Sequence, residues 1–200
     1  MRPVLSTLAA TLLLTSFPTA PAFAGWKLIE SGSENMLKKG GMTVTANGDW
    51  NRQTSRPGKK AEEWTMDGFS LNRVAFYGEI VTGDTLYKDR NKKERPLPTF
   101  DSSMLPPDII NWFEATIRIV RETAIFEVDN VQPFEFSGNP GFRFTYSYVD
   151  GDELKRRGDA AGAMIDGKFY MMDYSAADIH YFDKDHDKFE AMLQSLRVTS

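Results

Sequence analysis

The chain has no cysteine and only two histidines, His180 and His186, among its 200 residues. Without cysteine it can form no disulfide, has no cysteine nucleophile and has no lipobox cysteine to carry a lipid. Six positions apart on a helix, the two histidines would point ~240° apart, so we expect no zinc site from these two residues alone. Stability must come from a hydrophobic core, and an aromatic content of 12% is high enough to form one.

The motifs of the common enzyme classes are missing as well. The sequence contains no Gly-x-Ser-x-Gly elbow, no His-Glu-x-x-His pair, no Walker-type loop and no dinucleotide fingerprint. The acidic run at residues 183–187 fails as a calcium loop, because Lys188 stands where the loop needs glycine and Gln194 where it needs a bidentate glutamate. We therefore predict no catalytic, metal-binding or cofactor-binding residue, and no cofactor.

Basic charge and long apolar runs are also scarce. The 24 Lys and Arg against 28 Asp and Glu give a formal net charge of −4, which argues against nucleic acid as the main partner. The longest apolar run, residues 4–17, is shorter than the ~20 residues that a membrane span needs. A basic start before it and small residues up to Ala24 after it predict a signal peptide over residues 1–24, cleaved after Ala24. We expect residues 25–200 to be a single periplasmic or secreted domain with no transmembrane span.

The clearest pattern that is present covers residues 141–176. From Phe142 to Tyr148, aromatic side chains alternate with polar ones, which is the period of a β-strand. Two further strand-like runs, residues 159–165 and 168–175, meet at Asp166-Gly167. This dipeptide favours a type I′ hairpin turn, because both turn positions take positive φ. The region is therefore predicted to form three consecutive antiparallel strands.

A two-residue turn also fixes the register of the hairpin, with Ile165 opposite Lys168 and Met164 opposite Phe169. Apolar side chains then lie on both faces. One face carries Met164, Phe169 and Met171, and the other carries Ala163, Ile165, Tyr170 and Met172. Helices before and after these strands are available to cover the two faces. The predicted fold class is α+β: an antiparallel β-sheet covered by helices on both faces, as an α/β/α sandwich.

Two helices are expected from apolar residues at helical spacing. The first follows Pro106-Pro107-Asp108, a helix-start signal, and should end near Ile119. The second lies within residues 178–200, with Asp187 and Glu190 as a capping box or with Asp183 or Asp185 as the cap. Their apolar stripes are Ile109, Phe113, Ile117 and Val120 in the first and Phe189, Met192, Leu193 and Leu196 in the second.

Shorter strands and loops complete the expected order. Asn47-Gly48 predicts a hairpin between residues 42–46 and 49–51, and Asp67-Gly68 joins residues 63–66 to 69–77. Residues 123–129 and 134–137 are expected as two strands, with Pro133 at an edge or a bulge. The polar residues 53–61 predict an exposed loop. The charged residues 82–98 predict a solvated, mobile loop, with a flexible arm that grips a partner as the alternative.

This order resembles the PsbP/Mog-type fold and, more narrowly, small exported proteins of Gram-negative bacteria, over about residues 41–198. The quoted stretches are Trp64-Thr-x-Asp-Gly, Gly141-Phe-Arg-Phe-Thr-Tyr, Asp166-Gly-Lys-Phe-Tyr and His180-Tyr-Phe-Asp. The resemblance implies a function in binding, because known members of the fold support a photosystem complex or bind the small GTPase Ran. It implies no site residue here, since neither contact motif is matched. Many of the bacterial relatives are lipoproteins, from which a chain without cysteine departs.

Two groups of side chains are candidate sites. Lys155, Arg156 and Arg157, with Arg143 beside them, are a candidate binding surface for an anionic lipid or sugar phosphate. Alternatively, they form a solvated strand start that protects a sheet edge from aggregation. The second group is Tyr174, Asp178, His180 and Tyr181, which either lock the last helix to the sheet through hydrogen bonds or line a ligand pocket.

The leading hypothesis is an exported, non-enzymatic envelope protein that binds an unknown protein or envelope component. One alternative is a small periplasmic hydrolase or transferase, which convergence of Asp173, Asp178 and His180 in a cleft would favour. The other is a small-ligand carrier, which a co-purifying lipid or metabolite would favour.

Overall fold

The fold is taken from a computed structural model that describes residues 25–37 and 40–199. The expected signal peptide, residues 1–24, lies outside the described residues. In chain order the elements are β1 (Trp26–Ile29), β2 (Glu34–Leu37), β3 (Met42–Thr45), β4 (Trp50–Gln53), β5 (Ala61–Thr65), β6 (Asn72–Ile80), α1 (Pro106–Val120), β7 (Ile125–Phe136), β8 (Asn139–Val149), β9 (Lys155–Ile165), β10 (Lys168–Ala177), α2 (Tyr181–Ser195) and β11 (Arg197–Val198). Neither α1 nor α2 is both long and apolar enough to cross a membrane, and these are the helices of the described residues.

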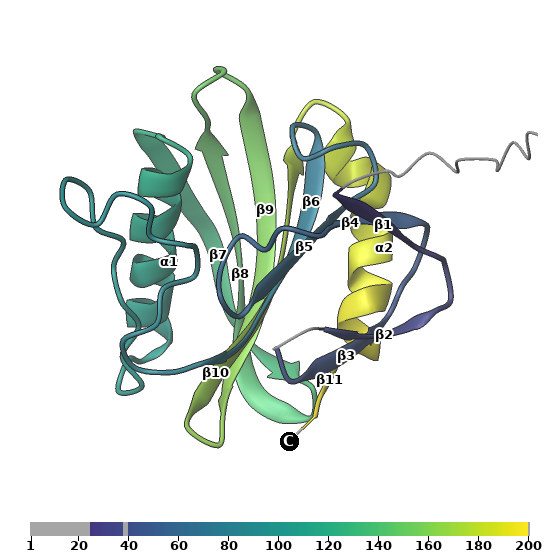
Figure 1. Ribbon diagram of the computed structural model, residues 1–200, viewed down its shortest axis with the longest axis horizontal. Helices are drawn as coiled ribbons and strands as arrows, with labels where there is room; N and C mark the ends of the chain where they lie inside the picture. Colours follow the sequence, from purple (N-terminus) through teal and green to yellow (C-terminus); the bar gives the residue numbers. More distant parts are fainter. Residues whose placement is uncertain (1–24, 38–39, 200) are drawn as a thin grey trace, which may run out of the picture.

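The strands form two antiparallel sheets (Figure 1). The large sheet has eight strands in the order β1-β4-β5-β6-β10-β9-β8-β7, and the small sheet has three in the order β11-β3-β2. Strand β7 therefore forms one edge of the large sheet and the short strand β1 forms the other. The predicted mixed α+β fold around a large antiparallel sheet is confirmed.

The three strands predicted from the alternating pattern are β8, β9 and β10, and they pair in sequence order. The predicted register is confirmed, with Ile165 opposite Lys168 and Met164 opposite Phe169. Asp166 and Gly167 have φ of 50° and 73°, as a type I′ turn requires. The local turn chemistry thus sets the alignment of the whole hairpin.

Side chains of the central strands divide between two apolar cores. Phe169 of β10 packs in one core with Phe113 of α1, and Tyr170 packs in the other with Phe189 of α2. Figure 1 shows α1 on one side of the large sheet and α2, with the small sheet, on the other. Each fully buried aromatic side chain contributes about 1.5–3 kcal/mol of transfer free energy.

Both predicted helices are present, but the predicted helix-start signal is confirmed only for α1. Helix α1 begins at Pro106 as the proline signal predicts, and the Asp108 carboxylate accepts a 3.0 Å hydrogen bond from the Leu105 N–H. Helix α2 begins at Tyr181, and no side chain caps it. The predicted caps of α2 are therefore wrong, because the helix starts before the acidic residues proposed for that role.

Two predictions about the strands are corrected. The hairpin at Asn47-Gly48 is wrong, because β3 pairs with β2 and β11 in the small sheet while β4 pairs with β1 and β5 in the large one. The two strands predicted within residues 123–137 are a single strand, β7, from Ile125 to Phe136. Its register shifts between Val128 and Asn130, and Pro133 lies in this edge strand, where a missing N–H is tolerated.

The polar residues 82–98 connect β6 to α1 and are anchored at both ends. Leu86, Tyr87 and Leu97 are buried in the same core as α1, whereas residues 90–96 are exposed. The expectation of a solvated segment therefore describes its middle and not its ends, because apolar side chains flank the charged run.

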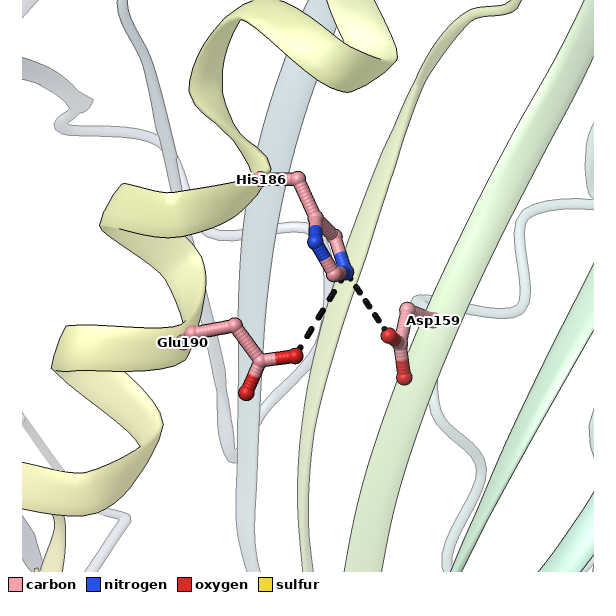
Figure 2. Close-up of side chains that lie close together, drawn as sticks. All are labelled: Asp159, His186 and Glu190. Carbon is pink, nitrogen blue, oxygen red and sulfur yellow. Dashed lines mark hydrogen bonds and ion pairs between the residues drawn. The ribbon is translucent and has the colours of Figure 1, made fainter.

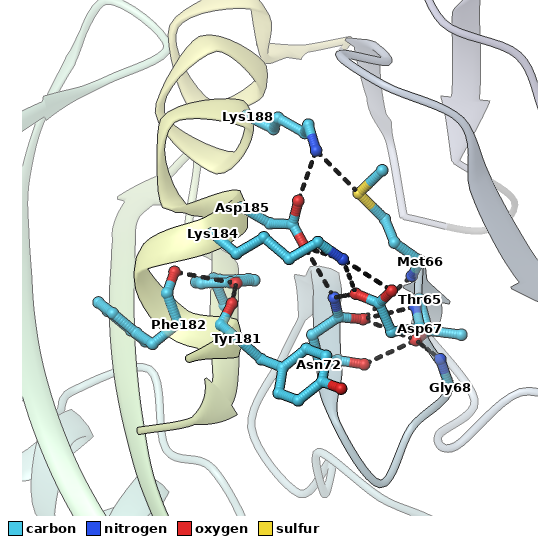
Figure 3. Close-up of polar contacts among 11 residues, drawn as sticks. Thr65, Met66, Asp67, Gly68, Asn72, Tyr181, Phe182, Lys184, Asp185 and Lys188 are labelled. Atoms are coloured by element: carbon cyan, nitrogen blue, oxygen red, sulfur yellow. Dashed lines mark hydrogen bonds and ion pairs between the residues drawn. The ribbon is translucent and has the colours of Figure 1, made fainter. Parts of the chain in front are cut away.

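Polar contacts hold the start of α2 against the turn between β5 and β6 (Figure 3). Asn72 donates from Nδ2 to Asp67 at 2.7 Å and to the buried carboxylate of Asp185 at 3.0 Å. Lys184 Nζ lies 2.7 Å from both carboxylate oxygens of Asp67. One buried amide thus joins the turn, the strand and the helix, which fixes the position of α2 along the sheet.

Gly158 of β9 lies under the ring of Tyr146, and a Cβ atom at Gly158 would lie 2.0 Å from Tyr146 Cζ. An alanine there must displace the ring and break the 2.6 Å hydrogen bond from Tyr146 Oη to buried Asp173. We expect Gly158→Ala to lower the free energy of unfolding by about 3 kcal/mol, measured by urea denaturation.

Gly151→Ala is the matched control, because a Cβ atom at Gly151 meets nothing within 4 Å. It should change the free energy of unfolding by less than about 0.5 kcal/mol. Equal unfolding midpoints for the two variants would contradict the close packing of Tyr146 on β9.

Candidate functional site

A group of charged side chains joins β8 and β9 to α2, and Figure 2 shows three of its members. Arg143 of β8 donates from Nε to Asp159 of β9 at 2.8 Å and forms an ion pair with Glu190 of α2. His186 Nε2 lies 2.9 Å from Asp159 Oδ2 and 3.7 Å from Glu190 Oε1. These four residues are called the Arg143 cluster below. It is the one place where the described residues bring a histidine and two carboxylates together.

The charges of the Arg143 cluster stabilise one another. Burial alone would raise the pKa of Asp159, but hydrogen bonds from Arg143 and His186 outweigh burial and lower it. The hydrogen bonds that Arg143 donates to Asp159 and to Glu190 raise the pKa of Arg143. Asp159 is therefore ionised at neutral pH, and its charge is balanced inside the cluster.

The cluster also has the donor set of a metal site. Asp159, His186 and Glu190 offer ligand atoms within 4.8 Å of one another, and a cavity of about 220 Å³ borders Asp159 and His186. A divalent cation would have to displace the Arg143 guanidinium, which already binds both carboxylates. The cluster is thus satisfied by its own ion pairs, and its geometry serves to dock α2 onto the sheet.

The four basic residues of the predicted binding surface are not gathered into one patch. Lys155, Arg156 and Arg157 are consecutive in β9, so the middle side chain points to the opposite face. Arg156 is buried there, where it pairs with Asp150 and donates at 2.8 Å to the carbonyl of Ser70. Its charge is neutralised inside the fold.

The other three predicted basic residues also have acidic partners. Asp178 lies 3.6 Å from Lys155 Nζ and 3.5 Å from Arg157 Nη1, and Arg157 pairs with Asp183 at 3.1 Å. Arg143 belongs to its own cluster. Binding of an anion by Lys155 and Arg157 stays a prediction, in which the anion would compete with these carboxylates.

The predicted polar group around Tyr174 lies where β10 leads into α2. Tyr174 Oη donates to the carbonyls of Tyr181 at 2.8 Å and Phe182 at 3.2 Å, and burial raises the pKa of its phenol. The rings of His180 and Tyr181 are in edge contact at 5.2 Å. Tyr174 thus links the helix to the sheet, while Asp178 turns toward the basic residues of β9.

A second charged group is buried in the core that contains α1. Arg73 of β6 donates to Asp173 of β10 at 2.7 Å and to Glu63 of β5 at 3.3 Å. Burial raises the pKa of Asp173, and the Arg73 charge opposes this rise. Because Asp173, Asp178 and His180 each have separate partners, the contacts of the described residues do not bring these three together in a cleft.

Sequence reasoning missed the Arg143 cluster as a unit. One signal was present, because His186 and Glu190 are four positions apart on an amphipathic helix and so share a face. The contact between Arg143 and Asp159 could not be predicted from the sequence, because Arg143 pairs in register with Ala161 and reaches Asp159 diagonally across the strands.

No family model and no curated protein matches the chain. Among solved structures it is similar to the solution structure of CyanoP, the cyanobacterial PsbP of Synechocystis sp. PCC 6803, with a TM-score of 0.51 and 16% identity over 92% of this chain and 98% of that chain. Lower TM-scores relate it to the Ran-binding protein Mog1p of Saccharomyces cerevisiae (0.47, 8% identity, 88% and 96% covered) and to LpqN, involved in cell envelope biogenesis of Mycobacterium tuberculosis (0.37, 9% identity, 92% and 90% covered). The likeness to CyanoP supports a PsbP-like α+β fold, and at this identity it shows the fold alone.

Arg143→Gln tests the docking role of the cluster. It leaves Asp159 buried with only His186 as a partner, so we expect the free energy of unfolding at pH 7 to fall by about 3 kcal/mol. A carboxyl with a lowered pKa stabilises the fold above its unfolded pKa of about 3.9, and this stabilisation is lost as pH falls through the folded value. The difference between wild type and variant should therefore shrink below about pH 4 in urea titrations.

Lys168→Gln is the control, because the ion pair of Lys168 with Glu79 lies at the surface, with both side chains partly open to solvent. It should leave the urea unfolding midpoint almost unchanged at any pH, because a solvent-screened ion pair contributes little to stability. A loss in Arg143→Gln that stays constant down to pH 3 would mean that Asp159 is not the group that Arg143 stabilises.

Proposed function

We propose that this chain is an exported, non-enzymatic binding domain that recognises a protein of the cell envelope. The signal-peptide pattern of residues 1–24 supports export to the periplasm or beyond. The PsbP-like fold and the lack of catalytic motifs in the sequence support a binding role. In this proposal the domain is an α/β/α sandwich whose helices close both faces of the sheet, so that edges and loops are left for a partner.

The observation that carries the proposal is the outer edge strand β7. It is 12 residues long, pairs with β8 on one side only, and most of its side chains are exposed. These include two large apolar residues, Ile125 and Val131, which are 55% and 51% exposed. A long edge strand presents unpaired N–H and C=O groups, to which an extended segment of another protein can add as a further strand.

The charge of β7 selects among partners. The strand contains Glu127, Asp129 and Glu135 and no lysine or arginine. A second copy paired antiparallel to β7 would place carboxylates near carboxylates, which is unfavourable. Pro133 and the register shift near Asp129 divide the edge into short segments. The partner that fits is therefore a short, extended, basic segment of an envelope protein.

Site-specific photo-cross-linking in living cells tests this proposal. A photoreactive amino acid in place of Val131 should give one defined adduct in the periplasmic fraction, identified by mass spectrometry. Protein from the same fraction should begin at Gly25 by intact mass, because the signal peptide ends at Ala24.

The matched control places the same photoreactive amino acid at Ile179, which is 85% exposed and lies in the turn before α2. The Ile179 protein should give no defined adduct. Adducts of the same kind from both positions, or none from Val131, would reject β7 as the binding edge. A mass that still includes residues 1–24 would reject export with cleavage at Ala24.

A further inference from the structure

A cleft lies where the loop after β4 meets the segment between β6 and α1. It consists of two adjoining cavities of about 520 Å³ each. Both are bordered by Tyr87, Lys88, Asp89 and Leu97. A volume of this size accommodates a small molecule rather than a flat macromolecular surface.

The walls of the cleft are held by specific contacts between the two segments. The Lys88 N–H donates to the Pro57 carbonyl at 2.7 Å, and Lys60 Nζ donates to Asp84 at 2.9 Å. Gly58 lies so close to the other segment that a Cβ atom would be 2.0 Å from the Leu86 carbonyl oxygen. A cleft with fixed walls loses little conformational entropy when a ligand binds.

The cleft is basic, although the protein as a whole is acidic. Seven cationic side chains and four carboxylates line it. The cations are Arg56, Lys59, Lys60, Lys88, Arg90, Lys92 and Arg95. The carboxylates are Glu63, Asp84, Asp89 and Glu122. Asp84 and Glu122 are paired with Lys60 and Arg95, and Glu63 with buried Arg73. The whole chain has a net charge of −4. A concave surface of one sign concentrates ligands of the opposite sign.

Two cations are available to a ligand: Lys88, which borders both cavities, and Arg90, which borders one of them. Lys88 and Arg90 are exposed, and neither forms an ion pair with another described residue. Arginine and lysine side chains converging on a cleft bind phosphate oxygens through charge-assisted hydrogen bonds. The charge and the donors of this cleft therefore suit a ligand that carries a phosphate or a similar oxyanion.

Asp89, which borders both cavities, indicates a second property of the ligand besides its negative charge. Its Oδ2 accepts a hydrogen bond from the Leu97 N–H at 3.2 Å. Its Oδ1 meets no hydrogen-bond donor among the described residues, and because this atom is shielded from solvent, the side chain must turn toward the cleft before a ligand hydroxyl can reach it. A buried acceptor of this kind favours a ligand hydroxyl, because an unmatched carboxylate oxygen is costly. We propose that the cleft binds a small sugar phosphate, with its phosphate at Lys88 and Arg90 and a hydroxyl donating to Asp89.

Calorimetric titration of the purified protein at low ionic strength tests the proposal with three probes: glucose 6-phosphate, inorganic phosphate and glucose. We expect saturable binding of both phosphates, tighter for glucose 6-phosphate, and no binding of glucose alone. Arg90→Gln should weaken both phosphates by roughly tenfold, because it removes a charge-assisted hydrogen bond. Arg90 is exposed, so this variant should fold normally.

Asp89→Asn separates the hydroxyl from the phosphate contribution. It keeps an oxygen for the Leu97 N–H but replaces the free acceptor with a donor, so it should abolish the preference for glucose 6-phosphate and leave inorganic phosphate binding at least as strong. The control Arg197→Gln changes an exposed arginine in β11 and should leave all three titrations unchanged.

Three results would overturn the proposal. They are no saturable binding of either phosphate, equal binding of glucose 6-phosphate and inorganic phosphate by the wild type, and binding that survives the double variant Lys88→Gln, Arg90→Gln. None of these results bears on β7, so failure here and failure of the proposed protein-binding function are distinguishable.

Discussion

The structure depends on the burial of both faces of its central strands. Nine of the ten residues of β10 are buried, and residues 158–163 of β9 are buried as well. Because successive side chains of a strand point to opposite faces, such strands need an apolar cover on each side. Helix α1 with the buried ends of residues 82–98 packs on one side, and α2 with the small sheet packs on the other.

The same constraint explains why so many ionisable groups serve the fold. Arg73 and Asp173 lie on strands that are buried on both sides, so each needs the other as a counter-charge. Arg143 and Asp159 form an ion pair on the side of the sheet that faces α2. The helix completes this network with Glu190, which pairs with Arg143, and His186, which contacts Asp159. Residues that would suggest catalysis in isolation are thus bound to one another.

The parts of the fold that follow from local chemistry could be predicted from the sequence. The turn at Asp166-Gly167 fixed the register of β9 and β10, and apolar spacing located both helices within a few residues. The turn at Asn47-Gly48 was misread for a physical reason: a turn signal specifies a change of direction but not which strand pairs beyond it. Strand β3 belongs to the small sheet, where it pairs with β11, the strand that follows α2.

The candidate sites were less predictable, because they depend on contacts between distant segments. The Arg143 cluster needs a diagonal contact across β8 and β9, which alternation alone does not specify. The cleft depends on Leu86, Tyr87 and Leu97, three buried side chains within a segment whose composition is dominated by charge. Because these three side chains are buried, the charged segment that was predicted to be solvated forms one wall of the cleft.

Hydrogen–deuterium exchange most directly tests the central proposal, that a partner protein binds the edge strand β7 of the large sheet. The purified protein would be labelled in buffer and in envelope extract from the cells that make it. The account predicts that exchange slows in the extract for amides of β7, within residues 125–136, and is unchanged in β9 and β10, which are already buried. Slower exchange on α1 or α2 with β7 unchanged would contradict it, because the partner would then bind a face rather than the edge.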